Sequence, residues 1–420
     1  MKNGKVKKIF AVALSASLLA SLTVGCSQGG ESNDGGNGDE VTIEWWTPNW
    51  DEAESREMAE EFEKDNPGIH VEIVITDWDT YKSKITTATS TDNAPELCTV
   101  LLTDVAPFAK KGLLEPLDEL GAEAGVNFDD ILEPALDITT VDDTVYGIPF
   151  RYDGSGIYYN VDMLKEAGYD SFPETWDEMV EMAKALSTDG KYAFAWPLGN
   201  QANAATRFVQ QIYTHGGDVL NEDETECLLD SDEAKAALQN IVDSISQGYA
   251  SPSSAEYDNT TMREAFGQEQ LAFMLTGPFD VETLKTDYPD LNFATTVIPG
   301  DGGMGVTTAN GWGVILSANS DHKEEAAKFM AYITNPENQA RLTDSFPASK
   351  TAMEYEQFAT EELQPFMDQL DNSRPEPAYE RWAEMEPIIY QYMQNAIAGT
   401  MTVDEACKAM ATDINALLGN

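Results

Sequence analysis

The sequence has few of the residues on which most catalytic and metal-binding sites depend. It has four cysteines and three histidines in 420 residues, and His70, His215 and His322 show no spacing typical of metal ligands. No HExxH or P-loop occurs, and "YDGSGIYY" lacks the first glycine of a nucleophile elbow. "GDGGMG" has the GxGxxG spacing, but the residues after it do not predict a helix. We therefore expect no metal, no cofactor and no catalytic residue.

Basic residues are also scarce. The chain has 25 Lys and Arg against 74 Asp and Glu, a formal net charge of −49. So acidic a surface repels nucleic acid and favours solubility, but it does not define a fold. Hydrophobic residues make up 42% of the chain, which is enough for a core, and the length predicts two or three domain-sized units.

Long apolar runs are limited to one near the N-terminus. Residues 1–8 carry four lysines and no acid, and the sixteen small or apolar residues that follow end at Gly25-Cys26. This pattern predicts a signal peptide over residues 1–25, because the run is short for a membrane-spanning helix. Its end resembles the lipobox of bacterial lipoproteins, which implies lipidation of Cys26. A cleaved secretion signal without lipid is the alternative.

Residues 26–39 are mostly Gly, Ser, Asn and Asp, which predicts a flexible tether. If Cys26 carries lipid, the remaining cysteines are Cys98, Cys227 and Cys407, an odd number at separations above 100 residues. No disulfide framework follows from this spacing, and we expect three buried thiols.

After residue 40, strand-like and helix-like segments alternate. "VTIEWW" and "IHVEIVIT" have the alternation of strands and enclose a helical pattern that ends at "DNPG". Capping signatures predict helices that begin at Thr175, Asp230, Asn335 and Thr402. Apolar strands are expected at "LCTVLL", "GIYYN", "QLAFML" and "WGVILS". The pattern predicts an α/β fold with open sheets, since the last 90 residues are nearly all helical and cannot complete an eightfold barrel.

Several segments resemble family 1 extracellular solute-binding proteins, the group that contains maltose-binding protein. In family order they are "EFEKDNPGIHVEI", "DDTVYGIPF", "GIYYNVDMLKEAGYDSFPETWDEMVEMAKAL", "AFGQEQLAFMLTGPFD", "NGWGVILSANSDHKEEAAKFMAYITNPE" and "GTMTVDEACKAMATDI". Each motif is weak alone, but their shared order from about residue 41 to the C-terminus is specific.

The resemblance implies the type II periplasmic-binding-protein fold, with two lobes of open mixed sheets flanked by helices and a ligand cleft between the lobes. We expect an N-terminal lobe from residues 40–149 and 298–335, and a C-terminal lobe from residues 150–297 and 336–420.

The resemblance also implies a function without catalysis: a monomeric binding lipoprotein that captures a neutral oligosaccharide and delivers it to the permease subunits of an ABC importer. It would lie on the extracellular face of a Gram-positive cell membrane, attached only through its lipid. A polyamine, a phosphorylated polyol or an iron complex is the alternative ligand for the same fold. A secreted glycoside hydrolase with paired carboxylates is the alternative function. The sequence names neither the sugar nor the permease.

Aromatic residues are the first candidates for a sugar site, because sugars offer flat patches of C–H. "WWTPNW" places three tryptophans within six residues, and Trp45 and Trp46 face opposite sides if they lie on a strand. We expect Trp45 in the core and, by the resemblance, Trp46, Asn49 and Trp50 in the cleft. The alternative is that all three tryptophans are structural.

Three more aromatic residues are candidates. By the resemblance, Phe279 in "TGPFD" and Trp382 in "ERWAEM" match positions of stacking tryptophans, and Trp312 lies between two glycines in "NGWG". Glycines beside Trp312 allow a close approach of backbone or ligand. For Phe279 and Trp382 the alternative is core packing.

Polar candidates complete the predicted site. Asp104 matches an aspartate that accepts sugar hydroxyls, and its alternative role is a helix cap. Arg151 and Tyr152 follow the crossover "GIPF", where a guanidinium can donate two hydrogen bonds at once, and a solvated loop is the alternative. The remaining candidates are Asp79, Trp196, Asn200 and Arg374.

Overall fold

The computed structural model describes residues 41–89, 94–188, 190–300 and 302–419. The predicted signal peptide, the lipidation site Cys26 and the tether therefore lie outside the described residues. The residue boundaries expected for the two lobes stay a prediction.

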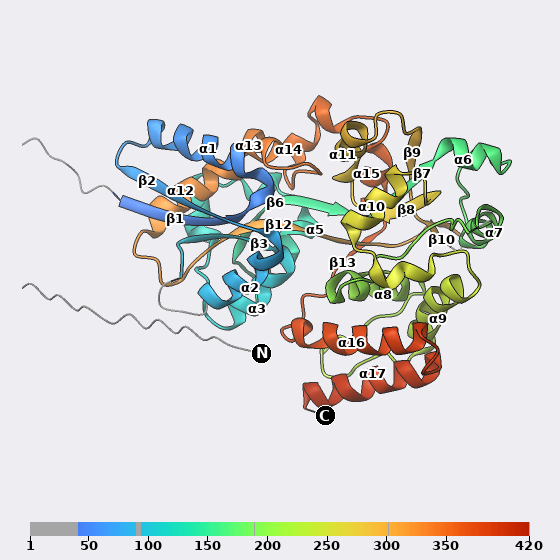
Figure 1. Ribbon diagram of the computed structural model, residues 1–420. Coiled ribbons are helices and arrows are strands. Elements are labelled where there is room, and N and C mark those ends of the chain that lie inside the picture. The colour runs from blue at the N-terminus through green and yellow to red at the C-terminus, as the bar shows by residue number, and fades with distance from the viewer. Residues whose placement is uncertain (1–40, 90–93, 189, 301, 420) are drawn as a thin grey trace, which may run out of the picture. The chain divides into compact units, whose positions relative to one another are not determined.

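The first sheet is mixed and has six strands in the described part of the chain (Figure 1). Its order is β13-β12-β3-β1-β2, and β6 also pairs with β12. β1 is parallel to β2 and β3, whereas β12 is antiparallel to β3 and β6. The strands are β1 Val41–Pro48, β2 Ile69–Thr76, β3 Leu97–Leu101, β6 Gly147–Gly154, β12 Thr307–Leu316 and β13 Ser373–Pro375.

Helices pack against this sheet or against one another around its core. They are α1 Glu52–Asp65, α2 Trp78–Ala88, α3 Leu102–Lys110, α4 Asp118–Ala124, α5 Glu133–Ile138 and α12 Lys323–Ile333. Trp45 is buried in the core, where its Nε1 donates to Thr99 Oγ1 at 3.1 Å, while its neighbour Trp46 is half-buried. This confirms the predicted core position of Trp45.

The second sheet is antiparallel, in the order β8-β7-β9. Its strands are β7 Gly156–Asn160, β8 Phe273–Thr276 and β9 Phe293–Thr296. Two hydrophobic cores surround it. The helices that pack here are α6 Val161–Glu166, α7 Trp176–Leu186, α8 Gln201–Thr214, α9 Asp232–Ser246, α10 Asn259–Gly267, α11 Asp280–Asp287, α15 Gln364–Leu370, α16 Trp382–Ile397 and α17 Val403–Leu418.

Shorter elements connect these parts. They are β4 Thr140–Val141, β5 Thr144–Val145, β10 Pro299–Gly300, β11 Gly303–Met304, α13 Pro336–Arg341, α14 Lys350–Met353 and the 3-10 turns η1 Asn49–Asp51, η2 Phe128–Asp130, η3 Pro252–Glu256 and η4 Glu356–Phe358. β10 and β11 pair antiparallel at the glycine-rich "GDGGMG" segment, and the next element in the described part of the chain is the strand β12, not a helix that could cradle a phosphate.

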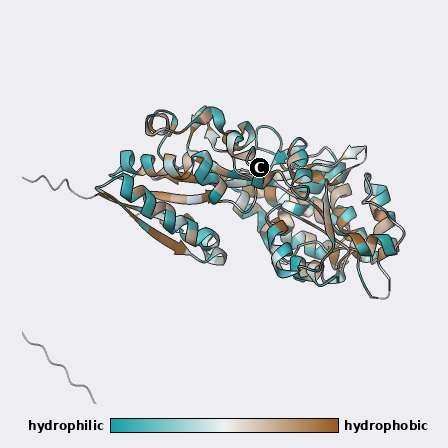
Figure 2. Cartoon of the chain, turned by 90° about the horizontal axis from the view of Figure 1, so that it is seen from above, coloured by the Kyte–Doolittle hydropathy of each residue, from teal (hydrophilic) through white to brown (hydrophobic). Residues whose placement is uncertain are grey.

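The amphipathic helices follow from their sequence. In α1 the buried residues Ser55, Met58, Ala59 and Phe62 have the spacing of one helix face, and Figure 2 shows much teal along the helices. The side chains of Thr175, Asn335 and Thr402 cap α7, α13 and α17 as predicted. The predicted cap at Asp230 is wrong by one residue, because Ser231 Oγ accepts the hydrogen bond from the backbone N–H of Ala234.

The connection between the two sheets is very short. β6 ends at Gly154 and β7 begins at Gly156, so only Ser155 separates a strand of the first sheet from a strand of the second. A short crossover holds both sheet edges close together and positions the residues described next.

Candidate ligand-binding site

A cavity of about 260 Å³ lies where β6 and β12 of the first sheet approach α8 and the N-terminal ends of α10 and α11. It combines aromatic rings with charged and amide side chains, the composition expected of a site for a polar ligand with apolar faces. Its lining comprises Leu101, Arg151, Asp153, Gly154, Ser155, Ala202, Asn203, Thr206, Arg207, Asn259, Gly277, Phe279, Thr308, Asn310, Gly311, Trp312 and Glu376.

Trp312 forms part of the cavity wall from the middle of β12. The residue is 9% exposed, and its indole meets Trp50 edge to face, with ring centroids 4.6 Å apart. The glycines beside it serve the strand pairing: a Cβ on Gly311 would lie 1.9 Å from the Arg151 carbonyl oxygen, and one on Gly313 would lie 3.0 Å from that of Ile148. The close approach predicted from "NGWG" is thus an approach of the β6 backbone.

Phe279 contributes a second ring at the N-terminus of α11. It is half-buried, and the Arg151 guanidinium carbon lies 5.4 Å from its ring centroid. A cation at this distance interacts favourably with the ring face. Phe279 and Trp312 therefore offer two aromatic surfaces to one cavity.

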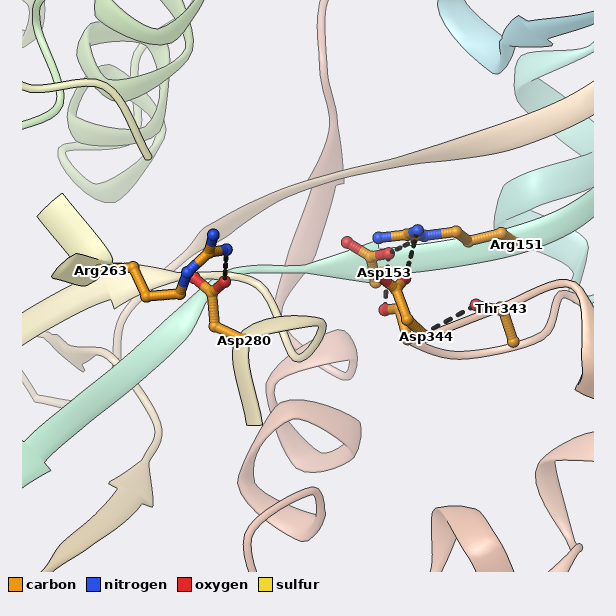
Figure 3. A network of polar contacts seen from close by, with 7 residues as sticks. Arg151, Asp153, Arg263, Asp280, Thr343 and Asp344 are labelled. Atoms are coloured by element: carbon orange, nitrogen blue, oxygen red, sulfur yellow. Dashed lines mark hydrogen bonds and ion pairs between the residues drawn. The ribbon is translucent and has the colours of Figure 1, made fainter. Parts of the chain in front are cut away.

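Arg151 is the centre of an ion-pair network (Figure 3). Its Nε donates to Asp153 Oδ2 at 2.9 Å and its Nη1 to Asp344 Oδ1 at 2.6 Å, while Ser345 Oγ donates to Asp153 at 2.7 Å. Burial lowers the pKa of Arg151, but the charges of Asp153 and Asp344 outweigh that effect and the pKa is raised. The side chain stays a cation, held in one orientation by two carboxylates.

Asp51 lies near this network at the start of α1. Burial and, secondly, the charge of Asp344 raise its pKa to about 7, although Arg151 opposes the shift. This carboxyl changes its charge near neutral pH.

Polar lining residues that the sequence analysis missed come from three segments. Asn310 Nδ2 donates to Thr103 Oγ1 at 3.1 Å and to Glu376 Oε2 at 2.9 Å. Asn310 precedes Trp312 by two residues on β12, and Asp153 follows Arg151 by two on β6, so strand periodicity could have found both. Arg207 lies inside α8, and no local pattern marks it.

Two predicted residues lie in hydrophobic cores and do not line this cavity. Tyr152 is 2% exposed and Trp196 is 3% exposed. The indole N–H of Trp196 donates to Ser244 Oγ at 2.8 Å, and its ring meets Phe194 edge to face. Asn200 has a capping role, since its Oδ1 accepts from the backbone N–H of Asn203 at the start of α8.

Arg374 lines a different cavity of about 610 Å³. Its guanidinium stacks on Tyr213, 3.7 Å from the ring centroid, and donates to Asp218 Oδ2 at 2.5 Å. Trp382 begins α16 and meets Tyr379, which also lines that cavity, edge to face at 6.2 Å. These two candidates are not brought together with Arg151, Phe279 and Trp312.

The other candidates belong to the first sheet or to elements that follow its strands. Trp46 is half-buried against the core, and within the described ranges its Nε1 has no hydrogen-bond partner. Asn49 is exposed in η1, and Asp104 lies half-buried in the first turn of α3. Asp79 belongs to the first turn of α2, but its side chain lies outside the described part of the structure.

Within the ranges given above, no group of three or more His, Cys, Asp or Glu side chains could hold a metal ion. None of the helices in those ranges is long and apolar enough to cross a membrane.

Comparison with known proteins places this chain in a defined family. Residues 48–340 match the family model described as bacterial extracellular solute-binding protein. The chain is 26% identical over 375 residues to a binding protein of Brucella abortus (strain 2308), covering 86% of this chain and 89% of the relative. It is 27% identical over 304 residues to the lactose-binding protein of Rhizobium radiobacter, covering 69% of each.

Solved structures agree on the fold. An ABC transporter solute-binding protein from Thermotoga lettingae, bound to α-D-tagatose, has a TM-score of 0.80 at 24% identity and covers 90% of this chain and all of its own. The sugar-binding protein MalE of Xanthomonas citri also has a TM-score of 0.80 at 24% identity, covering 90% of this chain and 98% of its own. These similarities confirm the predicted two-lobed α/β fold.

The class is therefore that of substrate-binding proteins of ABC transporters, which are not enzymes, as the sequence predicted. This chain belongs to the bacterial extracellular solute-binding protein family.

Proposed function

We propose that the chain captures a neutral oligosaccharide in the cavity lined by Trp312, Phe279 and Arg151 and delivers it to an ABC importer. The observation that carries this proposal is the combination of two aromatic rings with hydrogen-bonding side chains in one cavity. A sugar presents C–H faces and a rim of hydroxyls, so it needs both kinds of surface.

The charge of the lining favours a neutral ligand. The lining contains two arginines, Arg151 and Arg207, and two acids, Asp153 and Glu376, so its formal charges sum to zero. A polyamine would need uncompensated carboxylates, and a phosphorylated polyol or other anion would need uncompensated cations. Names of relatives agree with a sugar, since one is called lactose-binding and a solved neighbour holds tagatose.

A thermal-shift panel tests the ligand class. We would heat a soluble form that begins after Cys26 with maltotriose, lactose, tagatose, spermidine and glycerol 3-phosphate. A ligand at ~100 times its dissociation constant stabilises the folded state by about 2.7 kcal/mol. A shift with a neutral sugar alone supports the proposal. A shift only with spermidine or glycerol phosphate keeps the family and overturns the neutral ligand.

The proposal includes attachment to the outer face of a Gram-positive membrane through lipid on Cys26, after removal of residues 1–25. Support comes from the lysines, the apolar run and the Gly25-Cys26 pair of the sequence. Metabolic labelling with a fatty acid tests it. Label lost in Cys26→Ser supports a lipid anchor, and an unlabelled wild-type chain contradicts it. Size-exclusion chromatography tests the proposed monomer.

A further inference from the structure

Arg207 lies in α8 with its side chain at the cavity, yet it has no assigned role. It is 5% exposed and belongs to the lining. Its Nη1 donates to Ser155 Oγ at 2.9 Å and to Gln210 Oε1 at 3.1 Å. Its Nε has no hydrogen-bond partner among the residues that the structure describes. A buried donor without a hydrogen-bond partner is energetically unfavourable. An acceptor atom of a ligand that bonds to Nε would remove this cost.

Other arginines near the cavity or in the same part of the fold are paired. Arg151 pairs with Asp153 and Asp344, and Arg263 pairs with the buried Asp280 (Figure 3). None of the ion pairs formed by the described residues includes Arg207. Burial lowers the pKa of Arg207 to about 10, and only the charge of Glu376 opposes that shift. The guanidinium remains charged at neutral pH and keeps donor capacity for a ligand.

The same guanidinium is connected to the crossover between the sheets. Ser155, which accepts from Arg207, separates β6 from β7. The backbone N–H of Ser155 donates to Thr307 Oγ1 at 2.9 Å, and Thr307 Oγ1 donates back to the Ser155 carbonyl at 3.0 Å. Thr307 begins β12 and is fully buried, so the two strands that line the cavity are joined here.

We propose that Arg207 is a ligand-binding residue whose Nε–H donates to an uncharged oxygen of the bound sugar, a hydroxyl or ring oxygen, while its Nη1 holds the Ser155 crossover in place. This inference rests on the proposed function and adds a specific contact to it. Nη1 donates to Ser155 and Gln210, whereas Nε has no acceptor among the described residues, so in this proposal one side chain would link the sugar to the crossover. A lysine, with one ammonium group, cannot supply the same planar pair of donors.

Calorimetric titration of Arg207→Lys and Arg207→Gln tests the contact. The titrants are maltotriose, lactose and tagatose, with a glucuronic-acid disaccharide as the charged comparison. We expect both variants to bind the preferred neutral sugar about 10-fold to 100-fold more weakly, the factor for a hydrogen bond from a charged donor. Arg341→Gln is the matched control, because Arg341 pairs with Glu57 and Glu61 and does not line the cavity. Its affinity should equal that of the wild type.

A second variant tests the Ser155 crossover separately from the contact between Arg207 and the sugar. Thr307→Val keeps the shape and removes the hydrogen bonds of Thr307 Oγ1 without changing a lining residue. We expect weaker sugar binding, by a smaller factor than in Arg207→Lys. Wild-type affinity in Thr307→Val overturns the role of the crossover.

One further test uses only the wild-type protein, so its result does not depend on whether a variant folds. Arginine side-chain NMR of the wild type should show a changed Nε–H signal when the preferred sugar saturates the protein. Unchanged Nε–H signals, or wild-type affinity in both Arg207 variants, overturn the inference alone. If the glucuronic-acid disaccharide binds more tightly than every neutral sugar, the proposal that Arg207 Nε donates to an uncharged oxygen is wrong. Failure of all titrants to bind the wild type overturns the proposed function together with the inference.

Discussion

Trp50 meets Trp312 edge to face, with ring centroids 4.6 Å apart and an interplanar angle of 71°. Trp50 belongs to the turn that follows β1, whereas Trp312 lies on β12 and lines the cavity. The tryptophan-rich segment near residue 45 therefore has two roles: Trp45 fills the core, and Trp50 supports an aromatic wall of the proposed sugar site.

Replacing Trp50 should weaken sugar binding because Trp312 loses its neighbouring ring. An edge-to-face pair contributes about 0.5–1.5 kcal/mol, so Trp50→Leu should raise the dissociation constant for the preferred sugar by up to about 10-fold. Trp45→Leu is the control, since its indole lies away from the cavity in the core. That variant should lose stability in urea unfolding and keep its affinity. The reverse pattern would contradict these two roles.

The ring of Phe279 should matter for affinity more than for stability. Phe279→Leu keeps an apolar side chain but removes the flat face beside Arg151, so we expect about 5-fold to 10-fold weaker sugar binding. Phe293→Leu provides the comparison, because Phe293 is also half-buried but packs against Tyr158 outside the cavity. Calorimetry would detect the difference. Equal affinity losses in the two variants would exclude a specific role for Phe279.

Stability should depend on pH through Asp51. Its pKa is about 7 in the folded protein and 3.8 ordinarily, so the folded state binds more protons than the unfolded state between these values. The free energy of unfolding should therefore fall as pH rises from about 4 to about 7. The groups that act on Asp51 are Asp344, Arg151, Glu54 and the Trp50 side chain.

Urea unfolding of the wild type and Asp51→Asn at pH 5 and pH 8 isolates this contribution. The variant should lose less stability between the two pH values than the wild type, and it should be the more stable protein at pH 8. Identical pH dependence in both proteins would mean that Asp51 has an ordinary pKa.

The buried carboxylate of Asp280 should be essential for stability. It is fully buried and accepts from Arg263 Nη1 at 2.6 Å and from Thr276 Oγ1 at 2.8 Å. Asp280→Asn removes the negative charge that pairs with the Arg263 guanidinium, so we expect a loss of about 3 kcal/mol in urea unfolding. Glu384→Gln, which breaks the exposed pair with Arg381, should have a much smaller effect. Similar losses in both variants would refute the importance of burial.

The thiols of Cys98, Cys227 and Cys407 should be unreactive in the folded protein. All three are free and buried, as predicted from their spacing, and burial raises the pKa of Cys227 to about 11 and of Cys407 to about 12. A thiol-specific reagent should label them only in denaturant, because the thiolate is the reactive form. Rapid labelling of the native chain would contradict this burial.

The sequence predicted strands, helices and caps wherever local periodicity and capping residues specify them. The cap of α9 was assigned one residue early because Asp230 and Ser231 are both good capping residues, and only the backbone geometry selects Ser231. The short strand β13 was not predicted, since "SRP" has three residues and pairs with β12 from a distant part of the chain.

Residue type alone could not distinguish residues that line the cavity from residues of the hydrophobic cores. Trp312 and Phe279 line the cavity, whereas Trp196 and Tyr152, equally aromatic, are enclosed by the cores around them. Arg207 was missed because its contact with Ser155 joins residues 52 positions apart. Such a pair is created by tertiary packing, and neither segment contains a motif that indicates it.

The most direct measurement is a crystal structure of the soluble chain with the sugar that gives the largest thermal shift. The account predicts a sugar ring against Trp312 and Phe279, with one of its oxygens within hydrogen-bonding distance of Arg207 Nε. A sugar bound instead in the cavity lined by Arg374 and Tyr379 would contradict it.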